Sequence, residues 1–209
     1  MRIIAVLKCW GKTIITYFCA KATQMKKQNT SLMIIAILMI LVAAISRLVL
    51  YPHNFSPIIG MAIFSGAVIK DKRLAFAMPL LAMFLSDVLF QAFNIAPGFW
   101  GWGQVIHYGI YALITCFGFL MKKINVLNVV GFSIAASLIF FLLSNTVFFI
   151  TDNPVYHTYG QNFQGYIDCL AGGLPFLKNS LVADLVYSVI LFGGYYWMEK
   201  EVFNKAVSK

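Results

Sequence analysis

The feature that most constrains this chain is a series of apolar segments of about the length that crosses a bilayer, roughly 20 residues. Six such segments occupy residues 32–51, 55–69, 74–94, 104–121, 126–150 and 174–198. The segment 55–69 is short, at 15 residues with Pro57 near its start, so a partly re-entrant helix is the alternative there. The series predicts an all-α integral membrane protein with six transmembrane helices.

The composition points to the same class of protein. Hydrophobic residues make up 61% and charged residues 11% of the 209 residues, against about 45–50% and about 25% in soluble domains. So little polar surface excludes a soluble enzyme, a disordered chain and a nucleic-acid-binding module. The four cysteines show no CxxC spacing, so we expect neither a disulfide framework nor a zinc site.

Basic residues alternate from one connecting segment to the next. Ten of them flank the series or lie in every second loop: Lys26, Lys27, Lys70, Lys72, Arg73, Lys122, Lys123, Lys200, Lys205 and Lys209. The other loops, at 52–54, 95–103 and 151–173, contain no Lys or Arg. Because cytoplasmic loops carry the excess of basic residues, both termini are predicted to be cytoplasmic. The net charge of +9 therefore marks the loops of a multi-pass protein of the bacterial plasma (inner) membrane.

The first 24 residues differ from the rest. Residues 1–24 contain four basic residues and no acid, and their apolar runs are too short for a span. They lack the order of a signal peptide. Met25 is an alternative start, and otherwise this segment forms a basic helix on the inner membrane surface. The chain thus divides into a basic extension, 1–24, and one transmembrane domain, 25–209.

The longest predicted loop, 151–173, lies on the outer side. Its aromatic residues are Tyr156, Tyr159, Phe163 and Tyr166. Loops of this length often cover a binding site. Aromatic residues also anchor proteins in the membrane interface, and the sequence leaves both interpretations open.

Ionisable side chains inside the apolar segments carry the functional information. Arg47, Asp87, Lys178 and Asp184 all lie within predicted spans. Each costs roughly 2.5–3.5 kcal/mol at the centre of a membrane helix, so we expect them to face the protein interior or a wet cavity. They concentrate in the outer half of the membrane. Lys178 lies about 120° around its helix from Asp184, and we expect it to extend to the outer interface.

The simplest arrangement of these groups is an outward-opening polar and aromatic pocket between the spans 32–51, 74–94, 104–121 and 174–198. We predict a small solute bound by Arg47, Asn54, Asp87, His107, Tyr108, Asn145, Asn179 and Asp184. The planar fork of Arg47 suits a carboxylate. Asp87 or Asp184 suits an amine, a hydroxyl or a coupling proton. No catalytic, cofactor-binding or metal-binding residue is predicted.

Two other classes of function compete with transport. The first is an accessory membrane protein held together by buried ion pairs, for example Arg47 with Asp87. The second is an intramembrane enzyme, for which Gly131-Phe132-Ser133-Ile134 is the one GxSx match. No HExxH motif occurs, and the segment 174–198 carries no histidine to activate that serine, so we expect no enzyme. Ser133 and Ser137 are instead expected to allow close helix packing.

Several short runs carry a resemblance to a known family. The chain resembles uncharacterised bacterial membrane proteins classed as candidate transport proteins, in the runs Arg47-x4-Pro52-His53-Asn54-Phe55-Ser56-Pro57, Phe64-Ser65-Gly66-Ala67, Pro79-x6-Ser86-Asp87, Ser144-Asn145, Gly173-Leu174-Pro175-Phe176 and Asn179. The resemblance covers about residues 32–195 and implies membrane transport.

The six-span layout also resembles the S components of energy-coupling-factor importers. That resemblance implies a vitamin or similar micronutrient as the solute, with a coupling membrane subunit and two ATPases as partners. It also implies an AxxxA motif on the first span, from which this chain departs, since Ile40 stands four residues after Ala36. The chain has no GxxxxGK[ST] motif, so an ATP-driven step needs such partners.

Overall fold

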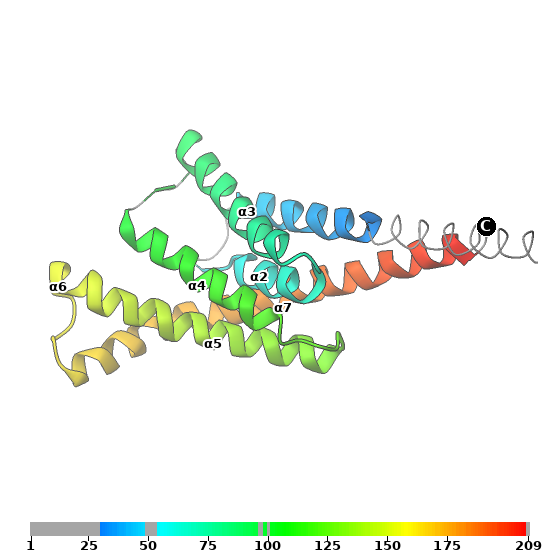
Figure 1. Ribbon diagram of the computed structural model, residues 1–209. Helices are drawn as coiled ribbons and strands as arrows, with labels where there is room; N and C mark the ends of the chain where they lie inside the picture. The colour runs from blue at the N-terminus through cyan, green and yellow to red at the C-terminus, as the bar shows by residue number, and fades with distance from the viewer. Residues whose placement is uncertain (1–29, 49–53, 96–97, 100, 208–209) are drawn as a thin grey trace, which may run out of the picture.

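The computed structural model describes residues 30–48, 54–95, 98–99 and 101–207. All regular structure in these residues is helical, which confirms the predicted all-α class. The helices are Thr30–Ser46, α2 (Ile58–Val68), α3 (Lys72–Ala92), α4 (Trp102–Gly118), α5 (Val126–Thr151), α6 (Asn153–Tyr156) and α7 (Phe163–Val207). Figure 1 shows them as an elongated bundle. The extension 1–24 and Met25 lie outside the described residues.

The helix starts follow from capping side chains. Asp71 precedes α3 and accepts hydrogen bonds from the backbone N–H groups of Arg73 and Leu74. Asn125 precedes α5 and accepts one from Asn128. Short polar side chains at this position satisfy N–H groups that have no partner within the helix. The apolar runs after these caps then form α3 and α5 within about two residues of the predicted bounds.

The prediction of a loop over 151–173 is wrong for residues 163–173, which are helical. α7 begins at Phe163 and runs for 45 residues, with Pro175 inside it. The side chain of Asn162 accepts a hydrogen bond from the Gly165 backbone N–H at 2.8 Å and so caps this helix. Proline removes one helical hydrogen bond, but α7 continues through Pro175. The connection between α5 and α7 is therefore α6 followed by residues 157–162.

The first predicted span, 32–51, is also altered. The helix Thr30–Ser46 ends just before Arg47, which lies in a turn with Leu48. Residues 49–53, where the predicted span ends, lie outside the described residues. Arg47 therefore extends from a helix end, and this frees its long side chain to reach a neighbouring helix.

The centre of the bundle is α2. Nine of its 11 residues, from Ile58 to Gly66, are buried, and the helix contacts α3, α4, α5 and α7. The contact with α4 is close, because a Cβ added at Gly118 would lie 2.7 Å from the carbonyl oxygen of Ile63. At about 1.5 Å per residue α2 is about 16 Å long. Alone it is too short for a hydrocarbon core of about 30 Å.

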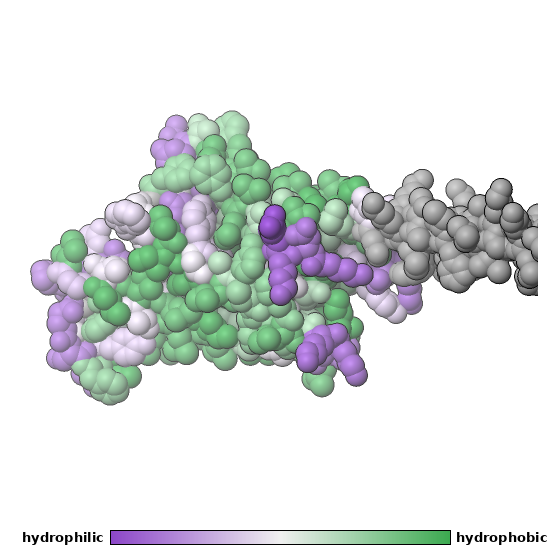
Figure 2. Space-filling model, viewed as in Figure 1, coloured by the Kyte–Doolittle hydropathy of each residue, from purple (hydrophilic) through white to green (hydrophobic). Residues whose placement is uncertain are grey.

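The outer surface of the bundle is hydrophobic. Val42, Leu113 and Val189 each expose more than half of their side chains, on three different helices. Figure 2 shows hydrophobic residues over most of one face, with hydrophilic residues gathered toward its ends. Three described helices are long and apolar enough to cross a membrane: Lys72–Ala92, Val126–Thr151 and Phe163–Glu201. Such exposure of apolar helices is what a lipid environment requires, and the chain is a membrane protein.

Candidate functional site

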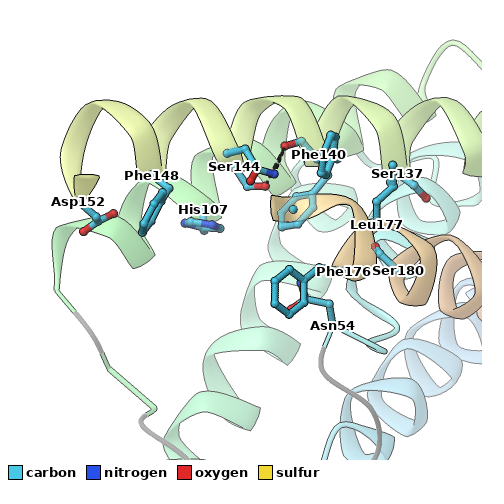
Figure 3. Close-up of a pocket in the computed structure, with 13 residues that line it drawn as sticks. Asn54, His107, Ser137, Phe140, Ser144, Phe148, Asp152, Phe176, Leu177 and Ser180 are labelled. Carbon is cyan, nitrogen blue, oxygen red and sulfur yellow. Dashed lines mark hydrogen bonds between the residues drawn. The ribbon is translucent and has the colours of Figure 1, made fainter. Parts of the chain in front are cut away.

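A pocket of about 320 Å³ lies mainly between α5 and α7 (Figure 3). Its lining residues are Asn54, His107, Ser137, Phe140, Phe141, Ser144, Asn145, Phe148, Asp152, Gly173, Phe176, Leu177 and Ser180. Most of them come from α5 and α7, while His107 comes from α4 and Asn54 precedes α2. Four phenylalanines and Leu177 form the apolar part of the lining, and seven of the 13 residues are polar. Apolar walls with placed polar groups are common in sites for small organic ligands.

The α5 wall is a single helix face. Ser137, Ser144, Phe148 and Asp152 follow one another along α5 in Figure 3, with Asp152 at the end of the helix. Residues separated by three or four positions lie on the same face of a helix. The 15-residue step from Ser137 to Asp152 corresponds to about 22 Å. The wall therefore extends from the end of the bundle at Asp152 to a floor at Ser137.

Beneath this floor lies a buried carboxyl group. Asp184 of α7 is 1% exposed, and its Oδ2 accepts hydrogen bonds from Ser137 Oγ at 2.6 Å and from Ser180 Oγ at 3.2 Å. Both serines line the pocket. One helical turn further in, Ser133 donates to Ser188 at 2.7 Å. We call these five residues the Asp184 cluster.

One oxygen of this carboxyl group lacks a partner. Asp184 Oδ1 is buried and has no hydrogen-bond partner among the described residues. The two helices that pack on α7 most directly, α5 and α2, contain no ionisable residue. α4 contributes Tyr111, whose phenol interacts electrostatically with Asp184. In the described part of the chain, the cluster therefore holds a carboxyl group without a basic partner.

The second polar cluster contains a carboxylate that is paired with a basic residue. Arg47 Nη1 lies 3.1 Å from Asp87 Oδ1 and also contacts the Ser86 hydroxyl. Asp87 Oδ2 accepts from Tyr108 Oη at 2.6 Å and from Gln104 Nε2 at 2.9 Å. Here both carboxylate oxygens are satisfied and the charge is neutralised by a guanidinium. We call these five residues the Arg47–Asp87 cluster.

Further contacts surround the Arg47–Asp87 cluster. The guanidinium carbon of Arg47 lies 5.2 Å from the centre of the Phe90 ring, which favours a cation. Gln104 Nε2 also donates to the Gly98 carbonyl at 2.9 Å. Gly98 in turn donates from its backbone to Gln91 Oε1 at 3.2 Å. These bonds tie the segment between α3 and α4 to the end of α3.

The structure divides the eight residues predicted to bind solute. Asn54, His107 and Asn145 line the pocket, and Asp184 lies behind its floor. Arg47, Asp87 and Tyr108 form the other cluster. Asn179 is on α7 but outside the pocket lining.

The predicted pocket walls need a correction. The spans 32–51 and 74–94 contribute no described lining residue, whereas α5 contributes most of one wall. The reason is the packing order. Among the described helices, α3 contacts α2 and α4 but neither α5 nor α7. A side chain on α3 therefore cannot reach a pocket between α5 and α7.

Sequence reasoning missed the α5 face. Ser137 was interpreted as a residue for close helix packing, yet it binds Asp184 and lines the pocket. The phenylalanine residues at 140, 141, 148 and 176 were also missed. The sequence pattern that indicates this face is the helical spacing of Ser137, Ser144 and Asp152. Phenylalanine residues at the same spacing place polar and aromatic side chains on one face of the helix.

Together, the fold and the pocket define a helical membrane protein with an open pocket lined by phenylalanine and polar side chains. The chain belongs to the Family of unknown function (DUF6580), whose model matches residues 26–206. No curated protein and no solved structure matches the chain.

Proposed function

We propose that this chain is a transport protein that binds a small solute in the pocket between α5 and α7. The observation that carries the proposal is the pocket itself, with about 320 Å³ of space, aromatic walls and a buried carboxyl group beneath its floor. Cavities of roughly 300–1,000 Å³ with apolar walls and a few directed polar groups are typical of ligand sites.

In the proposed topology the chain crosses the bacterial plasma membrane six times, with both termini in the cytoplasm. The alternating basic loops support this orientation. α3, α5 and α7 supply three spans, and the helix Thr30–Ser46, α2 and α4 would complete the series. Asp152 and α6 would then lie on the outer side, so solute would enter the pocket from outside.

The proposed protein partners are those that would supply energy for transport. The sequence contains no phosphate-binding loop motif, so ATP-driven import would require a coupling membrane subunit and ATPases, as in energy-coupling-factor importers. We propose no enzymatic activity. Ser133, the serine of the GxSx match, is fully buried, and its hydroxyl lies within hydrogen-bond distance of the Val129 carbonyl and the Ser188 hydroxyl.

The proposal is tested by purifying the full chain in mild detergent and identifying co-purifying small molecules and proteins by mass spectrometry. Gly173→Ala is the blocking variant, because the added Cβ would lie 2.7 Å from Asn145 Oδ1 and 2.8 Å from Phe141 Cε2. Gly193→Ala is its control on the same helix, with nothing within 4 Å of the added Cβ.

We expect a reproducible small molecule on the wild-type protein and on Gly193→Ala, and its loss from folded Gly173→Ala. A molecule retained equally by all three proteins would contradict the pocket as the solute site. Co-purifying ATPases would support the importer form of the proposal, and their absence would favour a transporter that works alone.

The second candidate is an accessory membrane protein without a solute. The Arg47–Asp87 cluster favours it, because a fully bonded ion pair can serve only to hold helices together. Under this alternative, Gly173→Ala would leave the protein's cellular role unchanged while Arg47→Ala would abolish it.

A further inference from the structure

The polar groups of the pocket allow its solute to be described more closely. Building on the proposed function, we propose that the pocket selects a small organic cation, such as a primary amine carried on an aromatic or aliphatic body. Three independent features support this ligand class: the direction of the hydrogen bonds, the sign of the charges and the nature of the walls.

Four of the polar pocket side chains direct a donor to the protein itself. Ser137 and Ser180 direct their hydroxyls to Asp184 Oδ2. Asn145 Nδ2 donates to the Phe141 carbonyl at 2.8 Å, and the Ser144 hydroxyl points to the same carbonyl at 3.3 Å. A hydroxyl that donates its single proton keeps acceptor lone pairs, and an amide keeps its carbonyl oxygen.

His107 behaves in the same way. Its Nδ1 lies 2.8 Å from the Gly103 carbonyl oxygen, which can only accept, so this nitrogen carries a proton. This N–H is used within α4. The polar side chains around the pocket therefore favour a ligand that brings its own donors, as an ammonium group does.

The carboxyl groups at the pocket are Asp152 in its lining and Asp184 behind its floor. Asp152 is the one Asp, Glu, Lys or Arg among the described lining residues. Asp184 lies one hydrogen bond behind the floor, with its Oδ1 unpartnered. A buried carboxylate without a cation is costly, and a cationic group at Ser137 and Ser180 would offset that cost. Arg47, the residue expected to hold a carboxylate, is instead bound to Asp87.

The walls suit the rest of such a ligand. Four phenyl rings surround the space, at positions 140, 141, 148 and 176. Ring faces attract cations and pack against an apolar body. His107 holds one ring in place, with its own ring centre 6.0 Å from that of Phe140. An anionic solute would find no Lys or Arg among the described lining residues.

The test uses two matched sets of probes that share a skeleton and differ in charge. One set is phenethylamine, phenethyl alcohol and hydrocinnamate, and the other is hexylamine, hexanol and heptanoate. Each probe is added to the purified full chain in detergent, and binding is followed by calorimetry and by the shift in unfolding midpoint. The proteins compared are wild type, Asp184→Asn, Ser180→Ala, Gly173→Ala and Gly193→Ala.

We expect the amines to bind wild type and Gly193→Ala at least about tenfold more tightly than their alcohols and acids, as a charge-assisted contact requires. Asp184→Asn should remove this preference, and Gly173→Ala should remove binding of every probe. Ser180→Ala keeps Asp184 and removes one acceptor, so a partial loss is expected, and this variant serves as the test if Asp184→Asn does not fold.

Other outcomes separate the two proposals. If acids or alcohols bind as well as amines, and Gly173→Ala removes that binding, the cation preference is wrong while the pocket remains a solute site. If amine preference persists in both Asp184→Asn and Ser180→Ala, the role given to Asp184 is wrong. If no probe binds, or if binding survives Gly173→Ala, both this inference and the proposed function are contradicted.

Discussion

Two buried aspartates in this molecule have opposite surroundings. Asp87 pairs with Arg47 and accepts hydrogen bonds from Gln104 and Tyr108. Asp184 accepts from two serines through one oxygen and leaves the other unpartnered. A satisfied ion pair stabilises the arrangement of helices around it, whereas an unsatisfied carboxyl group costs stability. The comparison favours a structural role for Asp87, and it is consistent with the proposal that Asp184 serves a ligand.

Breaking the Arg47–Asp87 pair should lower the free energy of unfolding the most. Arg47→Ala leaves Asp87 buried beside Gln104 and Tyr108 without a cation, and removing one partner of a buried pair costs about 3–5 kcal/mol. Equilibrium unfolding in detergent would measure this loss. The double variant Arg47→Ala with Asp87→Ala should recover part of it, because no charge is then left unpaired. A loss below about 1 kcal/mol, typical of an exposed pair, would show that the pair is not structural.

Removing one neutral hydrogen-bond donor from the same cluster should lower the free energy of unfolding by an intermediate amount. Tyr108→Phe deletes the 2.6 Å hydrogen bond to Asp87 Oδ2 while keeping the ring. Hydrogen bonds to charged groups contribute about 1.5–3 kcal/mol, and we expect a loss in that range by the same unfolding measurement. The control is Tyr196→Phe on α7, whose side chain is exposed. Equal, small losses in the two variants would contradict the role assigned to Tyr108.

Neutralising Asp184 should have the smallest effect on stability. Asp184→Asn keeps an oxygen to accept from Ser137 and removes a charge that lacks a basic partner among the described residues. We expect the free energy of unfolding to change by less than about 1 kcal/mol or to rise, because removing a charge removes a desolvation cost. A loss as large as that of Arg47→Ala would place Asp184 in the structural class with Asp87.

The sequence predicts most of the helices for simple physical reasons. α3 and α5 match the predicted spans because an apolar run follows a capping side chain, Asp71 or Asn125. The start of α7 differs from the prediction, because the glycine-containing run 163–173 is assigned to the loop 151–173 whereas α7 begins at Phe163. The capping residue Asn162 was the local signal for that helix. The finer topology, with six spans and cytoplasmic termini, stays a prediction.

The candidate site was predicted only in part. Arg47 and Asp87 pair with each other, which is among the alternatives that the sequence leaves open. Lys178, another ionisable residue inside an apolar segment, is exposed. The separation of Asp87 and Asp184 into two clusters depends on α2, which occupies the centre and contacts α3, α4, α5 and α7. Single-helix periodicity gives the face of each helix but not which helices are neighbours. For that reason the sequence placed Asp87 and Asp184 in one pocket.

The most direct test compares Asp184→Asn and Asp87→Asn in the same detergent solution. For each protein, the free energy of unfolding and the affinity for phenethylamine are measured beside wild type. We predict that Asp184→Asn retains its stability and loses phenethylamine binding, while Asp87→Asn loses stability because Arg47 is left without its anion. The account would be contradicted if Asp184→Asn unfolded easily, or if it bound phenethylamine as tightly as wild type does.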